Sequence, residues 1–287
     1  MPPASIASDI AVLDSRAQLH HTPCGAGQLV WRVSSTPTVR VGEGGREPPP
    51  VVLLHGGSGS WTHWLRNIDN LARRHTLWIP DLAGCGDSGL PPGAHDADSI
   101  FEHVATGIAQ VAAGQPVDLI GFSFGSLVSG FLTAHHPELI KRLVLVAPPS
   151  LGIKMPTVHL QSMSRAMSPA EHEAATRHNL QSMMLHRAAS IDDVAVATHA
   201  ANFARDRLRR RRISRTDIMA RLKLRWQCPV YVICGREDVL ARHELHRLPA
   251  LLEPCDLRGL RLIDQAGHWV QYEQPDAFHE AIAAFLG

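Results

Sequence analysis

The sequence lacks several features that would mark a special class of protein. Its five cysteines form an odd, scattered set without a CxxC pair, so we expect reduced thiols rather than a disulfide framework. No apolar run approaches the roughly 18–20 residues that a membrane-spanning helix needs. The first residues, MPPASIASDIAVLD, lack the basic and apolar regions of a secretory signal. These absences predict a soluble, globular, cytoplasmic protein that does not act at a membrane.

The sequence also has almost no net charge. Its 28 Lys and Arg residues against 27 Asp and Glu residues give +1, which does not demand a nucleic acid or an anionic membrane as partner. The charge is unevenly distributed, however. Residues 151–225 have a balance of +8, and the rest of the chain has a balance of −7. The middle stretch is therefore a different kind of sequence from its flanks.

The flanking parts alternate between short apolar runs and amphipathic segments. Runs of this kind, bounded by Gly, Pro or Asp, are typical of strands buried on both faces of a parallel sheet. The predicted strands are Val51–Leu54, Leu77–Ile79, Val117–Ile120, Leu143–Val146, Val230–Ile233 and Leu260–Ile263. Predicted helices cover residues 99–113, 126–134 and 275–286. The pattern predicts an α/β fold with a doubly wound, mostly parallel sheet.

Two segments depart from this alternation. We expect a β-hairpin from Leu29–Ser34 and Thr38–Val41 before the first buried strand. Residues 151–225 contain no strand-like apolar run and are rich in Ala, His and Met, so we expect a helical cap inserted over the C-terminal edge of the sheet. Residues 1–150 and 226–287 would then form one core.

The sequence GFSFG, residues 121–125, follows a predicted strand directly and precedes a predicted helix. A nucleophilic serine has to stand on a sharp strand-to-helix turn, where small residues two positions before and after it avoid collisions. The position therefore predicts that Ser123 is a nucleophile.

The sequence HGGS, residues 55–58, ends an earlier strand. Acyl transfer needs two backbone N–H groups directed at the developing oxyanion. We expect one from Phe124, directly after the serine, and the other from Gly57.

A base and an acid follow later in the chain. Asp238 comes after the strand at 230–233, and His268 follows the next strand 30 residues further on. His268 would take the Ser123 proton, and Asp238 would orient the imidazole and stabilise its charged form. Glu237 and Asp264 are competing acids, and Asp238 is preferred because it lies at the end of a strand and its turn.

From about residue 28 to the C-terminus the chain resembles the α/β-hydrolase superfamily. The segments HGGSGSW, DLAGCGDSG, GFSFG, GRED and GHW occur in the order of that family. The resemblance implies an α/β-hydrolase fold, a serine nucleophile and a lid at 151–225. It also implies that the loop at residues 81–89 has a structural role in shaping the floor of the site.

Within the superfamily, His268-Trp269 followed by QYEQP resembles the hydrolases that cleave C–C bonds in meta-cleavage products of aromatic degradation. Those enzymes usually also have HGxGPGA at the oxyanion loop and Asn before the nucleophile. Here the loop reads HGGSGSW, and Phe122 precedes Ser123. Both departures remove polar or tight-turn elements expected to handle a dienoate substrate. Phe122 and Phe124 instead favour an apolar pocket suited to an ester with a hydrophobic part.

Several side chains are candidates for the substrate pocket. Phe122, Trp61 and Trp269 flank the motifs and could wall it. Arg205 or Arg207 could bind a substrate carboxylate, although a solvated helix face is the simpler interpretation of the arginine run at 207–215. The histidines of the cap show no metal-ligand spacing, so no metal is expected.

The sequence as a whole predicts a cofactor-free serine hydrolase with a small-molecule substrate. Small carboxylic esters or lactones are the preferred substrates, and meta-cleavage dienoates are the alternative. A ligand-sensing protein that keeps the fold without turnover is a third possibility. The natural substrate and the oligomeric state stay open, because the shape of the cap and pocket sets specificity.

Overall fold

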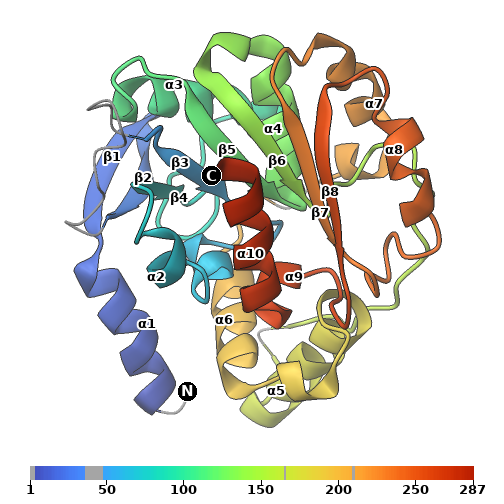
Figure 1. Ribbon diagram of the computed structural model, residues 1–287. Helices are drawn as coiled ribbons and strands as arrows, with labels where there is room; N and C mark the ends of the chain where they lie inside the picture. Colours follow the sequence, from blue (N-terminus) through green and yellow to red (C-terminus); the bar gives the residue numbers. More distant parts are fainter. Residues whose placement is uncertain (1–3, 36–47, 165, 209–210) are drawn as a thin grey trace.

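The computed structural model describes residues 4–35, 48–164, 166–208 and 211–287. Its strands form one sheet in the order β1-β2-β4-β3-β5-β6-β7-β8 (Figure 1). The strands from β3 to β8 are parallel, whereas β2 pairs antiparallel with both β1 and β4. The strands are β1 Gln18–Cys24, β2 Gly27–Ser34, β3 Val51–Leu54, β4 Leu77–Pro80, β5 Val117–Phe122, β6 Ile140–Val146, β7 Val230–Gly235 and β8 Leu257–Ile263.

Helices pack on both faces of this sheet, which confirms the predicted fold class. They are α1 Ala4–Arg16, α2 Ile68–Leu71, α3 Phe101–Val111, α4 Phe124–His135, α5 Pro169–Asn179, α6 Asp193–Ala204, α7 Ile218–Leu222, α8 Leu248–Leu251, α9 Val270–Glu273 and α10 Pro275–Leu286. No helix among the described residues is both long enough and apolar enough to span a membrane.

The central strands are buried on both faces, as their unbroken apolar runs predict. In β3, Val52 and Leu54 join the core cluster that contains α3 and α4. Val51 and Leu53 point to the opposite face and join the cluster that contains α10. Successive side chains of a strand alternate between faces, so one four-residue strand contributes to two cores.

The predicted hairpin is wrong in its pairing. Leu29–Ser34 lies in β2, and both edges of β2 are occupied, one by β1 and the other by β4. The hairpin turn lies at Gly25, whose φ of +60° suits glycine. The expected partner, Thr38–Val41, lies outside the described residues. The strand β1 escaped prediction because its sequence, QLHHTPC, has no apolar run.

The segment between β6 and β7 is helical and contains no strand among its described residues. The helices α5 and α6 pack on each other, next to a π-helical turn at Leu180–Met184 (Figure 1). The short helix α7 packs on α4 instead, and its buried Met219 belongs to the same core cluster as α4. The proposed cap boundaries at 151 and 225 stay predictions.

A buried ion pair joins the sheet to the last helix. Asp118 in β5 is fully buried and accepts hydrogen bonds from Arg142 Nε at 2.7 Å and Nη2 at 2.6 Å. Arg142 Nη1 also donates to the Leu286 carbonyl at 2.8 Å, at the end of α10. One guanidinium therefore connects β5, β6 and α10.

We expect Arg142→Ala to lower the free energy of unfolding by about 3 kcal/mol, because the substitution leaves the Asp118 carboxylate buried without its partner. Urea denaturation followed by circular dichroism measures the change. The control is Arg258→Ala, which removes an exposed ion pair with Asp256 and should leave the transition midpoint unchanged. Equal midpoints for both variants would contradict the prediction.

Candidate active site

Ser123 lies on a sharp turn between β5 and α4. Its φ of 51° and ψ of −112° are unusual for a residue with a side chain, so the surrounding structure has to hold this backbone. The Ser123 N–H donates to the Val146 carbonyl at 2.8 Å, which ties the turn to β6. The serine side chain is partly exposed at the carboxyl edge of the sheet.

The two glycines of GFSFG are required by close packing. A Cβ atom on Gly121 would lie 2.4 Å from Ser129 Oγ and 2.5 Å from the Gly125 carbonyl oxygen. A Cβ atom on Gly125 would lie 2.3 Å from the Leu54 carbonyl oxygen. The start of α4 thus presses against the backbone of β3, and that approach is possible only without side chains.

Ser123, His268 and Asp238 meet at the carboxyl ends of β5, β8 and β7. His268 Nε2 lies 2.8 Å from Ser123 Oγ, and His268 Nδ1 lies 2.7 Å from Asp238 Oδ2. The histidine is 4% exposed and the aspartate 1% exposed. The competing acid Asp264 pairs with Arg236 at the surface instead. The geometry permits proton transfer from the serine hydroxyl to a histidine oriented by a carboxylate.

The amides of Gly57 and Phe124 form no hydrogen bond with any described residue. The Gly56–Gly57 peptide is fixed by His55. Because the Leu82 N–H donates to His55 Nε2 at 2.8 Å, the ring carries its proton on Nδ1, which donates to the Gly56 carbonyl at 2.7 Å. In a trans peptide the N–H points opposite to the carbonyl, so this bond sets the direction of the Gly57 N–H.

Asp81 organises the loop at residues 81–89. Its fully buried carboxylate accepts hydrogen bonds from the Trp61 N–H at 2.8 Å and the Asp87 N–H at 2.9 Å. A Cβ atom on Gly86 would lie 2.2 Å from Asp81 Oδ2. The carboxylate thus joins this loop to the segment that follows the Gly57 loop.

The three aromatic pocket candidates lie in the core around the site. Trp61 is 5% exposed, and Phe122 and Trp269 are fully buried. The Phe122 ring lies 5.3 Å from the His268 ring, and Trp269 Nε1 donates to the His63 carbonyl at 3.0 Å. Phe122 and Trp269 thus pack around the histidines, and the adjacent cavity is lined by other residues.

The two arginine candidates hold the loop at residues 81–89. Arg205 pairs with Asp87, and Arg207 Nη2 donates to the Ser88 carbonyl. The arginine at the Gly57 loop is Arg211, which the sequence reasoning missed. Its Cδ lies 3.3 Å from the position of a Cβ on Gly57, and its guanidinium lies over the Phe124 ring at 5.2 Å.

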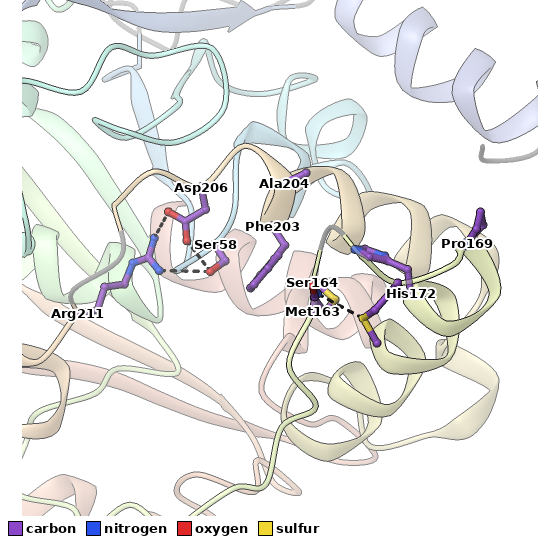
Figure 2. Close-up of a pocket in the computed structure, with 10 residues that line it drawn as sticks. Ser58, Met163, Ser164, Pro169, His172, Phe203, Ala204, Asp206 and Arg211 are labelled. Atoms are coloured by element: carbon purple, nitrogen blue, oxygen red, sulfur yellow. Dashed lines mark hydrogen bonds and ion pairs between the residues drawn. The ribbon is translucent and has the colours of Figure 1, made fainter.

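A cavity of about 1000 Å³ adjoins the Gly57 loop (Figure 2). At one end Ser58, Asp206 and Arg211 form a hydrogen-bonded group. Phe203 lies between this group and the other end, where Met163, Ser164 and His172 come from the loop before α5 and from α5 itself (Figure 2). Among the described residues, no cluster of three or more His, Cys, Asp or Glu could hold a metal ion.

A family model described as the alpha/beta hydrolase family matches residues 51–281. The chain belongs to this family. It is 26% identical over 253 residues to 2-hydroxy-6-oxo-2,4-heptadienoate hydrolase of Pseudomonas putida strain F1, covering 83% of this chain and 88% of the relative. It is 27% identical to 2-hydroxymuconate semialdehyde hydrolase of Pseudomonas sp. strain CF600, covering 83% and 86%.

Solved structures of this alpha/beta hydrolase fold align over nearly the whole chain. A serine hydrolase involved in carbazole degradation superposes with a TM-score of 0.72 at 19% identity, over 94% of this chain and 98% of the other. A putative aryl esterase from Burkholderia cenocepacia superposes with a TM-score of 0.71 at 20% identity, over 93% and 97%. At such identities the likeness establishes the fold.

A second feature that the sequence reasoning missed connects this hydrolase's His268 loop to the segment before α6. Glu273, 1% exposed, accepts hydrogen bonds from the Gly267 N–H at 2.8 Å, the His186 N–H at 2.9 Å and the Arg187 N–H at 2.6 Å. The Trp269 N–H also donates to the Met184 carbonyl at 2.8 Å. In the sequence, Glu273 is visible only as a glutamate five residues after His268, and this position does not indicate that it binds the amides of His186 and Arg187.

Two buried histidines lie near the hydrogen-bonded group of Ser123, His268 and Asp238. His63 packs at 5.0 Å from the Trp269 ring, and burial lowers its pKa well below the ordinary value. His199 in α6 is 8% exposed, and burial lowers its pKa to about 4. Neither His63 Nε2 nor His199 Nδ1 has a hydrogen-bond partner among the described residues. Both rings are therefore neutral at pH 7.

We expect the free energy of unfolding to fall as the pH drops from 7 to 4. The unfolded chain protonates His199 near pH 6.5, whereas the folded chain does so only near pH 4, so the unfolded state binds more protons in between. The loss from His199 amounts to about 3 kcal/mol. Urea denaturation at several pH values should show a shallower dependence for His199→Gln, while the exposed-site control His246→Gln should retain the wild-type slope. Identical slopes for His199→Gln and wild type would refute this.

Proposed function

We propose that this alpha/beta hydrolase cleaves carboxylic esters or lactones through an acyl-enzyme on Ser123. The observation that carries the proposal is the hydrogen-bonded relay from Ser123 through His268 to Asp238. In this reaction the backbone N–H groups of Gly57 and Phe124 would donate hydrogen bonds to the oxyanion.

The reaction proceeds in two halves. In the first, Ser123 Oγ bonds to the substrate carbonyl carbon while His268 Nε2 takes the hydroxyl proton. The tetrahedral intermediate then collapses, the ester C–O bond breaks, and His268 returns the proton to the leaving alcohol. In the second half, His268 deprotonates water, which attacks the acyl-enzyme and releases the acid and Ser123. Asp238 stabilises the imidazolium in both halves.

The ester preference is supported by the residues around the nucleophile. Phe122 occupies the position before Ser123, so that position offers no polar side chain to a dienoate. The oxyanion loop reads HGGSGSW, and its serines are already engaged, because Ser58 donates to Asp206 at 2.7 Å and Ser60 donates to Asn202 at 2.7 Å.

A second candidate is the hydrolysis of a C–C bond in a meta-cleavage product. It is favoured by the two Pseudomonas relatives, whose names describe such hydrolases and whose matches cover more than four fifths of both chains. The same three side chains would serve, with a carbon leaving group in place of the alcohol.

We expect Ser123→Ala to lower kcat for p-nitrophenyl butyrate by about 10⁶-fold, the scale seen when the nucleophile of a triad is removed. Initial rates at saturating substrate measure the effect, and circular dichroism checks the fold. Ser15→Ala, at an exposed serine in α1, is the matched control and should keep wild-type kcat. Retention of turnover by Ser123→Ala would exclude the mechanism.

We expect the purified protein to hydrolyse short p-nitrophenyl esters with a higher kcat/KM than a ring-fission dienoate. Both assays are spectrophotometric, so one preparation can serve for both. A large excess of kcat/KM on the dienoate would replace the first candidate with the second. Tight binding of either compound without repeated turnover would instead indicate a ligand-sensing protein.

A further inference from the structure

The charges beside the cavity are paired with one another. Arg211 Nη2 donates to Asp206 Oδ1 at 2.7 Å, and Nη1 donates to Ser58 Oγ at 3.3 Å. The second oxygen of Asp206 accepts from Ser58 Oγ at 2.7 Å. Asp206 is 8% exposed, and the side chain of Arg211 is 18% exposed. This end of the cavity is polar, but its net charge is zero.

Other arginines of the basic segment are engaged away from the cavity. Arg205 pairs with Asp87, and Arg207 donates to the carbonyls of Gly86 and Ser88. Arg177 bridges Glu173 and Asp193. These three described arginines therefore add no positive charge to the cavity.

The other lining residues are mostly apolar. Phe203 at the end of α6 is 42% exposed, which is high for a phenylalanine, and it lies beside the cavity with Met163 (Figure 2). Met167 also lines the cavity. Methionine side chains adapt to ligands of different shape. The volume of about 1000 Å³ is at the upper end of the range for small-molecule sites.

We propose that this cavity binds a neutral, apolar part of the substrate on Phe203, Met163 and Met167, and that its described lining residues provide no site for a substrate carboxylate. A carboxylate placed against Arg211 would also face Asp206 and would lose its hydration, and the described lining residues offer no unpaired arginine or lysine in return. An alkyl or aryl group would displace water from the three apolar side chains. The inference rests on the proposed function only where hydrolysis is the readout.

The first experiment compares chain-length series in the wild-type protein and in Phe203→Ala. p-Nitrophenyl acetate, butyrate, hexanoate and octanoate vary the acid part, and acetates of ethanol, butanol, hexanol and octanol vary the alcohol part. We expect kcat/KM to rise in one series by about fourfold per buried methylene group. In Phe203→Ala, kcat/KM should increase less with each added methylene group. Leu224→Ala, which removes an apolar side chain that is 65% exposed, is the control and should keep the wild-type trend.

The second experiment tests charge. We expect p-nitrophenyl hydrogen succinate to have a kcat/KM at least about tenfold lower than p-nitrophenyl pentanoate, because its carboxylate meets a neutral pair. Asp206→Asn keeps an oxygen acceptor for Ser58 but leaves the Arg211 charge unbalanced. The difference in kcat/KM between the pentanoate and the succinate ester should therefore become smaller in this variant. A wild-type preference for the acidic ester, or two flat series unaffected by Phe203→Ala, would overturn the inference.

Binding separates this inference from the proposed function. If the wild-type protein hydrolyses no ester, Ser123→Ala is titrated by calorimetry with methyl octanoate and with monomethyl suberate, which differ by a terminal carboxylate. Tighter binding of methyl octanoate, weakened in the Phe203→Ala/Ser123→Ala protein, supports the neutral cavity without any turnover. Equal or tighter binding of the suberate ester overturns it.

Discussion

The contact between the start of α4 and the backbone of β3 is the constraint on which the site depends. It exists because Gly125 carries no side chain, and Gly121 likewise allows β5 to approach the first turns of α4. Between these two glycines Ser123 adopts a backbone conformation with φ of 51°. That turn raises the serine at the carboxyl edge of the sheet, where the loops after β7 and β8 bring Asp238 and His268. The same turn leaves the Phe124 N–H at the beginning of a helix, where an amide has no partner within the helix.

The parts of the structure that could be predicted are those that local sequence determines. Four residues of β3 read as a buried strand because both of its faces meet apolar layers. The motif around Ser123 could be recognised because turn geometry restricts the neighbouring residue types. Ser123, Asp238 and His268 could be assigned to one site because the carboxyl ends of strands in a parallel sheet lie at the same edge.

The remaining features depend on partners that are distant in the sequence. Ser58 and Asp206 are 148 residues apart, and no pattern near either one indicates the other. Phe122 and Trp269 were predicted as pocket residues from their proximity to the motifs, yet both are buried in the core. Conversely, β1 is a polar strand at the sheet edge, so it gives no apolar signal. An arginine run indicates charge, but only the folded chain shows which carboxylates neutralise it.

The carboxylate of Glu273 joins the segment between α5 and α6 to the His268 loop by hydrogen bonds. It gathers one backbone N–H group from Gly267 and two from His186 and Arg187. The segment between α5 and α6 is thus bonded to the loop that carries His268. A chimera that takes residues 151–225 from a relative has to place two amides opposite Glu273. Without them, the buried Glu273 carboxylate keeps only the Gly267 N–H as a backbone donor, next to His268 in the chain. In this chain, residues 186–187 and residues 267–273 therefore have to be exchanged together.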